Sequence, residues 1–125
     1  MSPGVVQVLM VAAGGAAGAV MRFLLGFGLA SFLPGPWPTF VVNLVGSLMI
    51  GLAIGALTGS DWFESWGRFF LVTGLLGGFT TYSAFAMDAV ILIGEGRWWS
   101  AGTYMITTAV GCVVAAWFGV RIASG

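Results

Sequence analysis

The chain has 125 residues, of which 59% are hydrophobic and only 6% are charged, and its formal net charge is zero. Soluble domains carry about 25% charged residues, so this composition excludes a soluble domain, whose surface so few charges could not cover. A neutral chain offers no basic patch for nucleic acid, and one cysteine with no histidine excludes an intrachain disulfide and a cysteine-based metal cluster.

The first predicted element is a transmembrane helix over residues 5–30. About 20 apolar residues cross a bilayer core as a helix, and Val5–Met21 contains no charge. The first four residues carry no positive charge and the apolar run is longer than the core of a signal peptide, so we expect no cleavage. Gly14 and Gly18 have the spacing at which small residues let helix backbones approach closely in membranes. The same spacing recurs at Gly51 and Gly55 and at Gly74 and Gly78.

The second predicted helix covers residues 38–59. It follows the segment 34–38, Pro-Gly-Pro-Trp-Pro, which cannot continue a helix because proline lacks a backbone donor and restricts its predecessor. Thr39, Asn43 and Ser47 recur every fourth residue and form a polar stripe. A threonine or serine can bond its own backbone and be structurally silent. A primary amide cannot satisfy all its groups within its own helix, so we predict an interhelical or pore-lining role for Asn43.

The third predicted helix covers residues 67–94, after a short polar loop over residues 59–66, and it contains a break. Residues 77–83, Gly-Gly-Phe-Thr-Thr-Tyr-Ser, place two poor helix formers directly before hydroxyls that can bond freed carbonyls. Broken helices at mid-membrane depth can expose backbone groups that hold ions. Asp88 is expected either to reach a watery vestibule or to pair with an arginine, and Arg22 of the first helix has the same alternatives.

The fourth predicted helix covers residues 99–122. Ser100, Tyr104, Thr108 and Cys112 recur every fourth residue and form a second polar stripe. The sequence leaves open whether the Thr108 hydroxyl bonds its own backbone or serves a pathway. Tryptophans near the ends of the spans are typical of an aromatic belt at the membrane surface, where they would only fix the depth of the protein. They are Trp37, Trp62, Trp66, Trp98 and Trp99.

The distribution of arginines gives almost no preferred orientation. Four spans place both termini on one side, together with Arg68 and Arg121, whereas Arg97 lies on the opposite side and Arg22 is nearer to it. With two arginines on each side, the positive-inside rule predicts no orientation. Either the chain inserts both ways and pairs antiparallel with itself, or so few arginines carry no signal. Four helices enclose little interior, so a transport pathway would form more easily with a second chain.

Three segments resemble the Fluc (CrcB) fluoride channel family. Gly14–Phe23 resembles its helix 1 signature, Val42–Gly51 its helix 2 motif, and Thr73–Phe85 its helix 3 break and phenylalanine box. The resemblance covers all four helices in order and length. It implies an all-α membrane protein with four transmembrane helices, a broken third helix and a single channel domain over residues 1–125.

The resemblance also implies a function and a site. The chain would form an antiparallel, dual-topology homodimer in the inner cell membrane and export fluoride passively from the cytoplasm, lowering its toxicity. Structural Na⁺ would lie on the dimer axis, held by the backbone carbonyls of Gly77 and Thr80 from both chains. Tyr82 and Phe85 would offer ring edges to the anion. The full fluoride pathway would include Arg22, Asn43, Tyr82, Ser83, Phe85, Tyr104, Thr108 and Cys112.

The chain departs from the family pattern at five positions. Tyr82 stands where phenylalanine is usual, Ala84 where threonine is common and Asp88 where glutamate is usual. Cys112 replaces the usual serine and Ala116 ends the polar track early. We expect conduction to survive these changes with an altered rate or altered gating.

Two other function classes stay open. A small multidrug-type, proton-coupled exporter also has four helices, but it depends on a glutamate in helix 1 that this chain lacks, although Asp88 could serve proton coupling. A non-transporting membrane assembly subunit would bind a larger partner and carry no ion flux alone. We expect no enzyme, because the sequence has no histidine, no clustered acid pair and no cofactor loop.

Overall fold

A computed structural model describes residues 4–125, and the described chain is all-helical. Within this part of the chain, four stretches are long and apolar enough to cross a membrane, as the sequence predicted. They are α1 (Val5–Leu29), α2 (Trp37–Leu57), the segment Phe63–Gly94 and α5 (Trp98–Ser124). The expectation that no signal peptide is cleaved concerns residues 1–3 in part, and these lie outside the described residues.

The third span consists of several helical pieces. It contains η1 (Phe63–Gly67) and η2 (Phe69–Leu76), both π-helical, then α3 (Gly77–Phe79) and α4 (Tyr82–Gly94). A π-helix is wider than an α-helix, since each N–H bonds the carbonyl five residues back. Between α3 and α4, Thr80 has φ −84° and ψ 157°, and Thr81 has φ −147° and ψ 115°, so both residues are extended.

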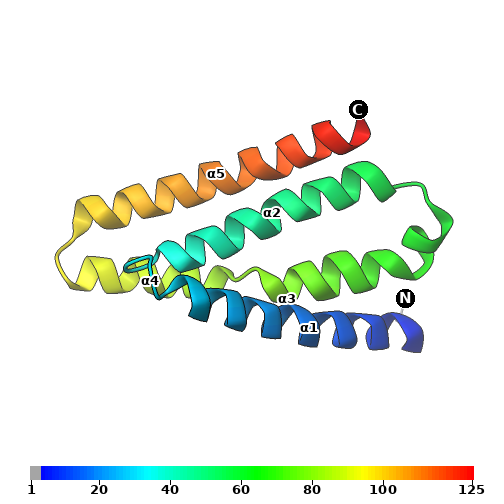
Figure 1. The fold of residues 1–125 in the computed structure, drawn as a ribbon, viewed down its shortest axis with the longest axis horizontal. Helices are drawn as coiled ribbons and strands as arrows, with labels where there is room; N and C mark the ends of the chain where they lie inside the picture. The colour runs from blue at the N-terminus through cyan, green and yellow to red at the C-terminus, as the bar shows by residue number, and fades with distance from the viewer. Residues whose placement is uncertain (1–3) are drawn as a thin grey trace.

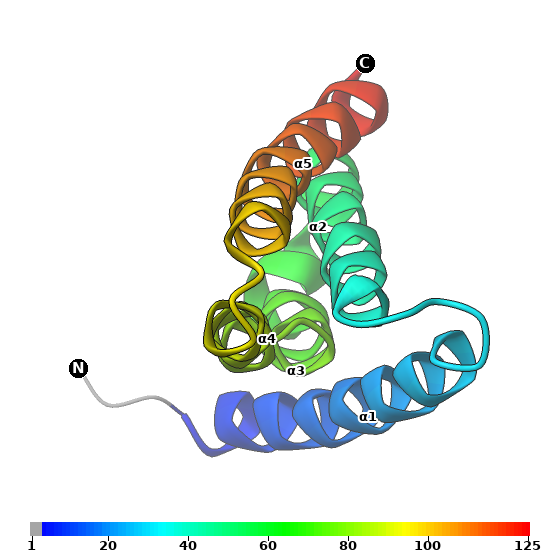
Figure 2. The same cartoon turned by 90° about the vertical axis from the view of Figure 1, so that its left-hand side faces the viewer.

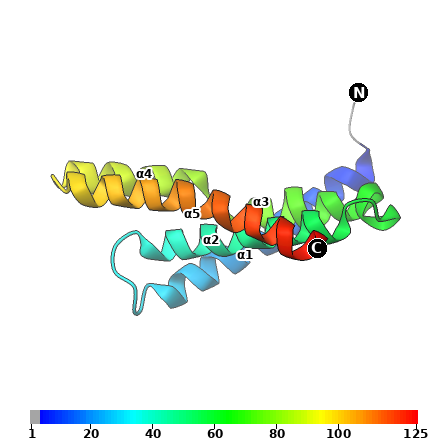
Figure 3. The ribbon, with the colours of Figure 1, turned by 90° about the horizontal axis from the view of Figure 1, so that it is seen from above.

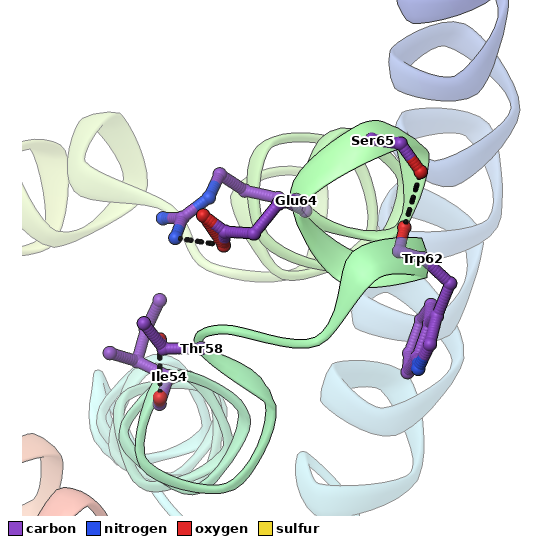
Figure 4. Close-up of polar contacts among 6 residues, drawn as sticks. Ile54, Thr58, Trp62, Glu64 and Ser65 are labelled. Carbon is purple, nitrogen blue, oxygen red and sulfur yellow. Dashed lines mark hydrogen bonds and ion pairs between the residues drawn. The ribbon is translucent and has the colours of Figure 1, made fainter.

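The loop predicted over residues 59–66 is shorter than expected, and the third span starts at Phe63 instead of residue 67. The polar residues of this segment satisfy their groups locally, which permits a helix. The Ser65 hydroxyl donates to the Trp62 carbonyl at 3.2 Å, and Glu64 forms an ion pair of 2.9 Å with Arg68 one turn later (Figure 4). Gly59, with φ 95°, makes the actual turn.

The spans run along the length of the molecule (Figure 1), and α1 is inclined to the others (Figure 2). The start of α1, the end of α5 and the turn after α2 lie at one end of the bundle, which confirms the predicted grouping of the ends. The α1–α2 connection and the α4–α5 turn lie at the other end. There the hairpin of α4 and α5 extends past the α1–α2 connection (Figure 3).

Glycines make two close helix contacts, as their spacing predicted. On α1, a Cβ on Gly14 would lie 2.8 Å from the Leu75 amide nitrogen of η2. On α2, a Cβ on Gly55 would lie 2.7 Å from the Val120 carbonyl oxygen of α5. No real side chain tolerates such distances, so glycine allows these backbones to touch. The fold therefore pairs α1 with η2 and α3, and α2 with α5 (Figure 2).

Aromatic packing holds α4 and α5 together beside the start of α2. Tyr104 is fully buried in a cluster with Ala89, Leu92 and Ala101. Trp37 packs edge-on against the Tyr104 ring, with centroids 5.9 Å apart. Trp37 is thus partly buried against this cluster, and its place in the aromatic belt stays a prediction. The other four tryptophans of the predicted belt, Trp62, Trp66, Trp98 and Trp99, are exposed.

Candidate functional site

A cavity of about 410 Å³ lies between α2, η2, the extended residues and α5. It brings together most of the residues predicted for the anion pathway and both residues predicted for the cation. They are Asn43, Gly77, Thr80, Tyr82, Phe85, Thr108 and Cys112. Arg22, Ser83 and Tyr104 do not line this cavity. None of the residues lining it carries a full charge. The cavity is thus a neutral space in which amide, hydroxyl, thiol and aromatic groups lie among aliphatic side chains such as Ile50, Val72 and Leu76.

Asn43 joins α2 to the third span at its extended residues. Its Nδ2 donates to the Thr81 carbonyl at 3.0 Å, and its Oδ1 accepts from the Thr81 N–H at 2.7 Å. The side chain is 8% exposed, so both bonds are largely protected from solvent. Through these bonds Asn43 links two helices, as the sequence predicted. Its Nδ2 keeps a second N–H that can donate to another acceptor.

The extended residues change the hydrogen bonding of the backbone around them. In a continuous helix the Thr81 N–H would bond the Gly77 carbonyl, and the Ala84 N–H would bond the Thr80 carbonyl. Here the Thr81 N–H donates to Asn43, and the Ala84 N–H donates to the Thr81 hydroxyl at 3.1 Å. Thr81 thus caps the start of α4. The carbonyls of Gly77 and Thr80 lose the donors that a continuous helix would give them.

Three aromatic rings follow one another along α4 and α5. The Tyr82 and Phe85 rings are 5.6 Å apart and steeply inclined, and the Phe85 and Tyr104 rings are 5.3 Å apart. Tyr82 is 82% exposed, whereas Tyr104 is fully buried. The series therefore runs from the open side of the cavity into the packed interior between α4 and α5.

Thr108 has a hydroxyl without a protein partner. The residue is 5% exposed, and its Oγ1 is the buried side-chain oxygen for which the described part of the chain provides no hydrogen bond. The alternative in which Thr108 bonds its own backbone is therefore wrong. A buried hydroxyl beside a cavity costs free energy unless water or a ligand satisfies it.

Arg22, Asp88 and Ser83 lie outside the cavity lining, and each has a polar contact of its own. Arg22 Nε donates to the Gly78 carbonyl at 3.1 Å, so this arginine links α1 to α3. Asp88 accepts from the Tyr104 hydroxyl at 3.2 Å. The ion pairs of residues 4–125 are Arg68–Glu64 and Arg97–Glu95, so the alternative in which Asp88 pairs with an arginine is wrong. The Ser83 hydroxyl lies 3.4 Å from that of Thr81.

Thr81 is the site residue that sequence reasoning missed. It receives both Asn43 bonds through its backbone and caps α4 through its hydroxyl. A signal was present, because threonine directly before an apolar helical run is a preferred N-cap residue. Gly46 was missed too, because its role depends on a neighbour distant in sequence: a Cβ there would lie 3.2 Å from the Phe79 ring.

Comparisons with known proteins all indicate the same family. The family model described as CrcB-like protein, Camphor Resistance (CrcB), matches residues 9–120. The chain is 42% identical over 117 residues to a fluoride-specific ion channel FluC of Nitrobacter winogradskyi, covering 92% of this chain and 93% of that protein. It is 43% identical over 116 residues to a FluC of Opitutus terrae, covering 89% and 87%. It is also 46% identical over 107 residues to a FluC of Sphingopyxis alaskensis, covering 84% and 85%.

Proposed function

Since the chain belongs to the CrcB-like family, whose model spans residues 9–120, we propose that it is a fluoride-specific ion channel. Relatives more than 40% identical over most of the chain are named as such channels, so the chain is an ion channel and not an enzyme. It passes fluoride down its gradient and so lowers the fluoride concentration in the cytoplasm. We assign it to the inner cell membrane, which it spans four times.

The observation that carries this proposal is the neutral, donor-lined cavity beside Asn43. Fluoride is small and strongly hydrated, so a pathway must replace its water with other hydrogen-bond donors. The remaining Asn43 N–H and the unpartnered Thr108 hydroxyl can donate, and the ring edges of Tyr82 and Phe85 carry partial positive charge. Conduction needs binding that is weak and repeated. A cavity without a fixed positive charge suits that need.

The same pathway extends beyond the cavity. Ser83 lies beside Thr81, Arg22 lies near Gly78, and Tyr104 stacks on Phe85. Cys112 follows Thr108 by one turn on α5 and offers a thiol, which is a weaker donor than a hydroxyl. We assign these residues to the route by which the anion approaches or leaves the cavity.

The working unit in this proposal is an antiparallel homodimer of dual topology. Tyr82 supports a second chain, since this aromatic ring is 82% exposed at the side of a polar cavity. A single four-helix chain would leave the amide and hydroxyl groups of this cavity facing lipid, which is costly. A second chain would cover it. Because of its two-fold symmetry, the dimer would also contain two copies of each pathway residue.

Structural Na⁺ on the dimer axis belongs to the same proposal, and the residues fit it. Gly77 and Thr80 both line the cavity, and the donors that a continuous helix would give their carbonyls bond elsewhere. Carbonyl oxygens are hard ligands that suit hard cations. Two such carbonyls from each chain would hold the ion and join the two protomers through their backbones.

The test is fluoride efflux from liposomes that hold the purified protein, with chloride efflux as the control. We expect fluoride to leave quickly and chloride to stay. Omission of sodium on both sides should slow or stop the fluoride flux. Equal efflux of the two anions, or no efflux above protein-free liposomes, would overturn the proposed function.

A further inference from the structure

A second cavity lies at the end of the bundle that carries the α4–α5 turn. Its volume is about 240 Å³, enough for several water molecules at ~30 Å³ each. Trp37, Leu92, Arg97, Ser100, Thr103 and Tyr104 are among the residues that line it. Three of these are hydroxyl residues on the first two turns of α5. The Arg97 side chain is 57% exposed, so the cavity opens next to a charged group at the surface.

The polar stripe of α5 connects this second cavity to the first. Ser100 and Tyr104 line the second cavity, and Thr108 and Cys112 line the first. Each of these four residues lies about one helical turn after the previous one, so together they follow one face of α5. The stripe is thus continuous from the surface near Arg97 to the middle of the molecule.

Two aromatic rings in contact link the linings of the two cavities. Phe85 lines the first cavity and Tyr104 lines the second, and their ring centroids are 5.3 Å apart with an interplanar angle of 45°. The Tyr104 hydroxyl donates to Asp88 at 3.2 Å, which restrains the Tyr104 ring.

The charge at this mouth is set by Arg97. Arg97 lines the second cavity, whereas Glu95, 3.7 Å away, does not. The long ion pair is exposed on both sides, so it neutralises the guanidinium only in part. Asp88 is the other charged group near this space, and it lies behind the Tyr104 ring, to whose hydroxyl it is bonded.

We infer that the second cavity is a mouth of the anion pathway and that Arg97 is the residue that concentrates anions there. The inference rests on the proposed fluoride conduction and names the charge that feeds it. A single positive charge at a cavity mouth raises the local concentration of small anions and hence the rate of entry. It does so without a tight site on the pathway itself.

The experiment measures initial fluoride efflux from phosphatidylcholine liposomes at low ionic strength. Arg97→Gln should lower the rate about two- to threefold, the scale of one charge acting across several ångströms of water. Arg97→Lys should keep the rate. Arg121→Gln is the matched control, since Arg121 stacks on Trp117 at the other end of α5 and lines neither cavity. Glu95→Gln should raise the rate.

Salt gives a second readout. The Debye length falls from about 30 Å at 0.01 M to about 8 Å at 0.15 M, so an impermeant salt should shrink the difference between Arg97→Gln and the unchanged protein. Equal rates for these two proteins at low salt would overturn the inference. A loss seen only in liposomes with phosphatidylglycerol would also overturn it, and would make the cavity a lipid phosphate site. If the unchanged protein conducts no fluoride, the proposed function itself fails.

Discussion

Asn43 joins α2 to the third span and to the cavity at the same time. It bonds both backbone groups of Thr81, which lies 38 residues later in the chain. The sequence indicated that an amide in this position needs a partner outside its own helix. It could not name the partner, because the contact depends on how two distant helices lie against each other. Thr81 itself was identifiable only as a good helix cap.

Replacement of Asn43 tests this connection. Asn43→Ala leaves the N–H and the carbonyl of Thr81 without their side-chain partner, so we expect unfolding in detergent to become easier by about 1–3 kcal/mol. Fluoride efflux should fall at least tenfold, which corresponds to a free-energy barrier higher by about 1.4 kcal/mol or more. Thermal unfolding and liposome efflux measure the two effects.

Ser47→Ala is the control for Asn43→Ala, since Ser47 lies one turn further on α2 and lines the same cavity. It should change stability by less than about 0.5 kcal/mol. Equal losses in the two variants would mean that any polar deletion in this cavity has the same cost, and that the Thr81 bonds carry no special weight.

Tyr82 offers a second test at the level of one residue. Its ring edge is what the proposed pathway uses, and its ring packs against Phe85. Tyr82→Phe keeps the ring and removes the hydroxyl, so fluoride efflux should persist with a rate within about tenfold of the original, equivalent to about 1.4 kcal/mol. Tyr82→Ala removes the ring and should abolish most of the efflux. Absence of efflux from both the tyrosine and the phenylalanine proteins would contradict this prediction.

At the scale of helices, hydrophobic run length predicted the four spans, and the ends of α1, α2 and α5 differ from prediction by only one or two residues. The start of the third span was predicted poorly. Glu64 and Ser65 read as loop residues, yet Glu64 pairs with Arg68 and the Ser65 hydroxyl bonds the Trp62 carbonyl, which permits a helix. The π-helical hydrogen bonding of η1 and η2 has no counterpart in the hydrophobic pattern of the sequence.

The glycine contacts of α1 supply a matched pair of substitutions. A Cβ on Gly18 would lie 2.8 Å from the Phe79 amide nitrogen, whereas a Cβ on Gly26 of the same helix would meet nothing within 4 Å. Gly18→Ala should destabilise the protein by about 1–3 kcal/mol through overpacking. Gly26→Ala should be neutral or stabilise it by up to about 1 kcal/mol, because alanine is the better helix former.

Thermal unfolding of both glycine variants in one detergent measures this difference. If Gly18→Ala is as stable as Gly26→Ala, α1 does not pack against α3 as closely as the distances indicate. The comparison is internal to one helix, so effects of detergent or of helix length apply to both variants alike.

At the scale of the whole molecule, the grouping of the termini could be predicted, but the direction of insertion could not. Arg68 lies near the start of the third span and Arg121 in the last turn of α5, whereas Arg97 lies at the opposite end, before the first turn of α5. Arg22 contributes little to this balance, because it lies within α1 and bonds the Gly78 carbonyl. Neither end therefore has an excess of exposed arginines large enough to decide the orientation.

Dual insertion gives the prediction at this scale. The double variant Cys112→Ser, Ser124→Cys has one cysteine, at position 124. This cysteine should react with an impermeant thiol reagent on both faces of sealed membrane vesicles. About half of the protein should be labelled from each side, since the arginine balance sets no preference. Labelling from one side only would contradict dual insertion and, with it, the antiparallel pair. A cysteine at Ser31 in the α1–α2 connection provides the control for the opposite end.

The pairing of the helices also has a consequence for the order in which the protein assembles. The close backbone contacts at glycines join spans that are not neighbours in the chain: α1 packs against η2 and α3, and α2 packs against α5. A ribosome delivers α1 and α2 to the membrane before either has its partner. The first of these contacts can form only once η2 has been inserted, and the second needs α5. A chain stopped after α2 would hold two glycine-rich helices without the partners that their glycines contact.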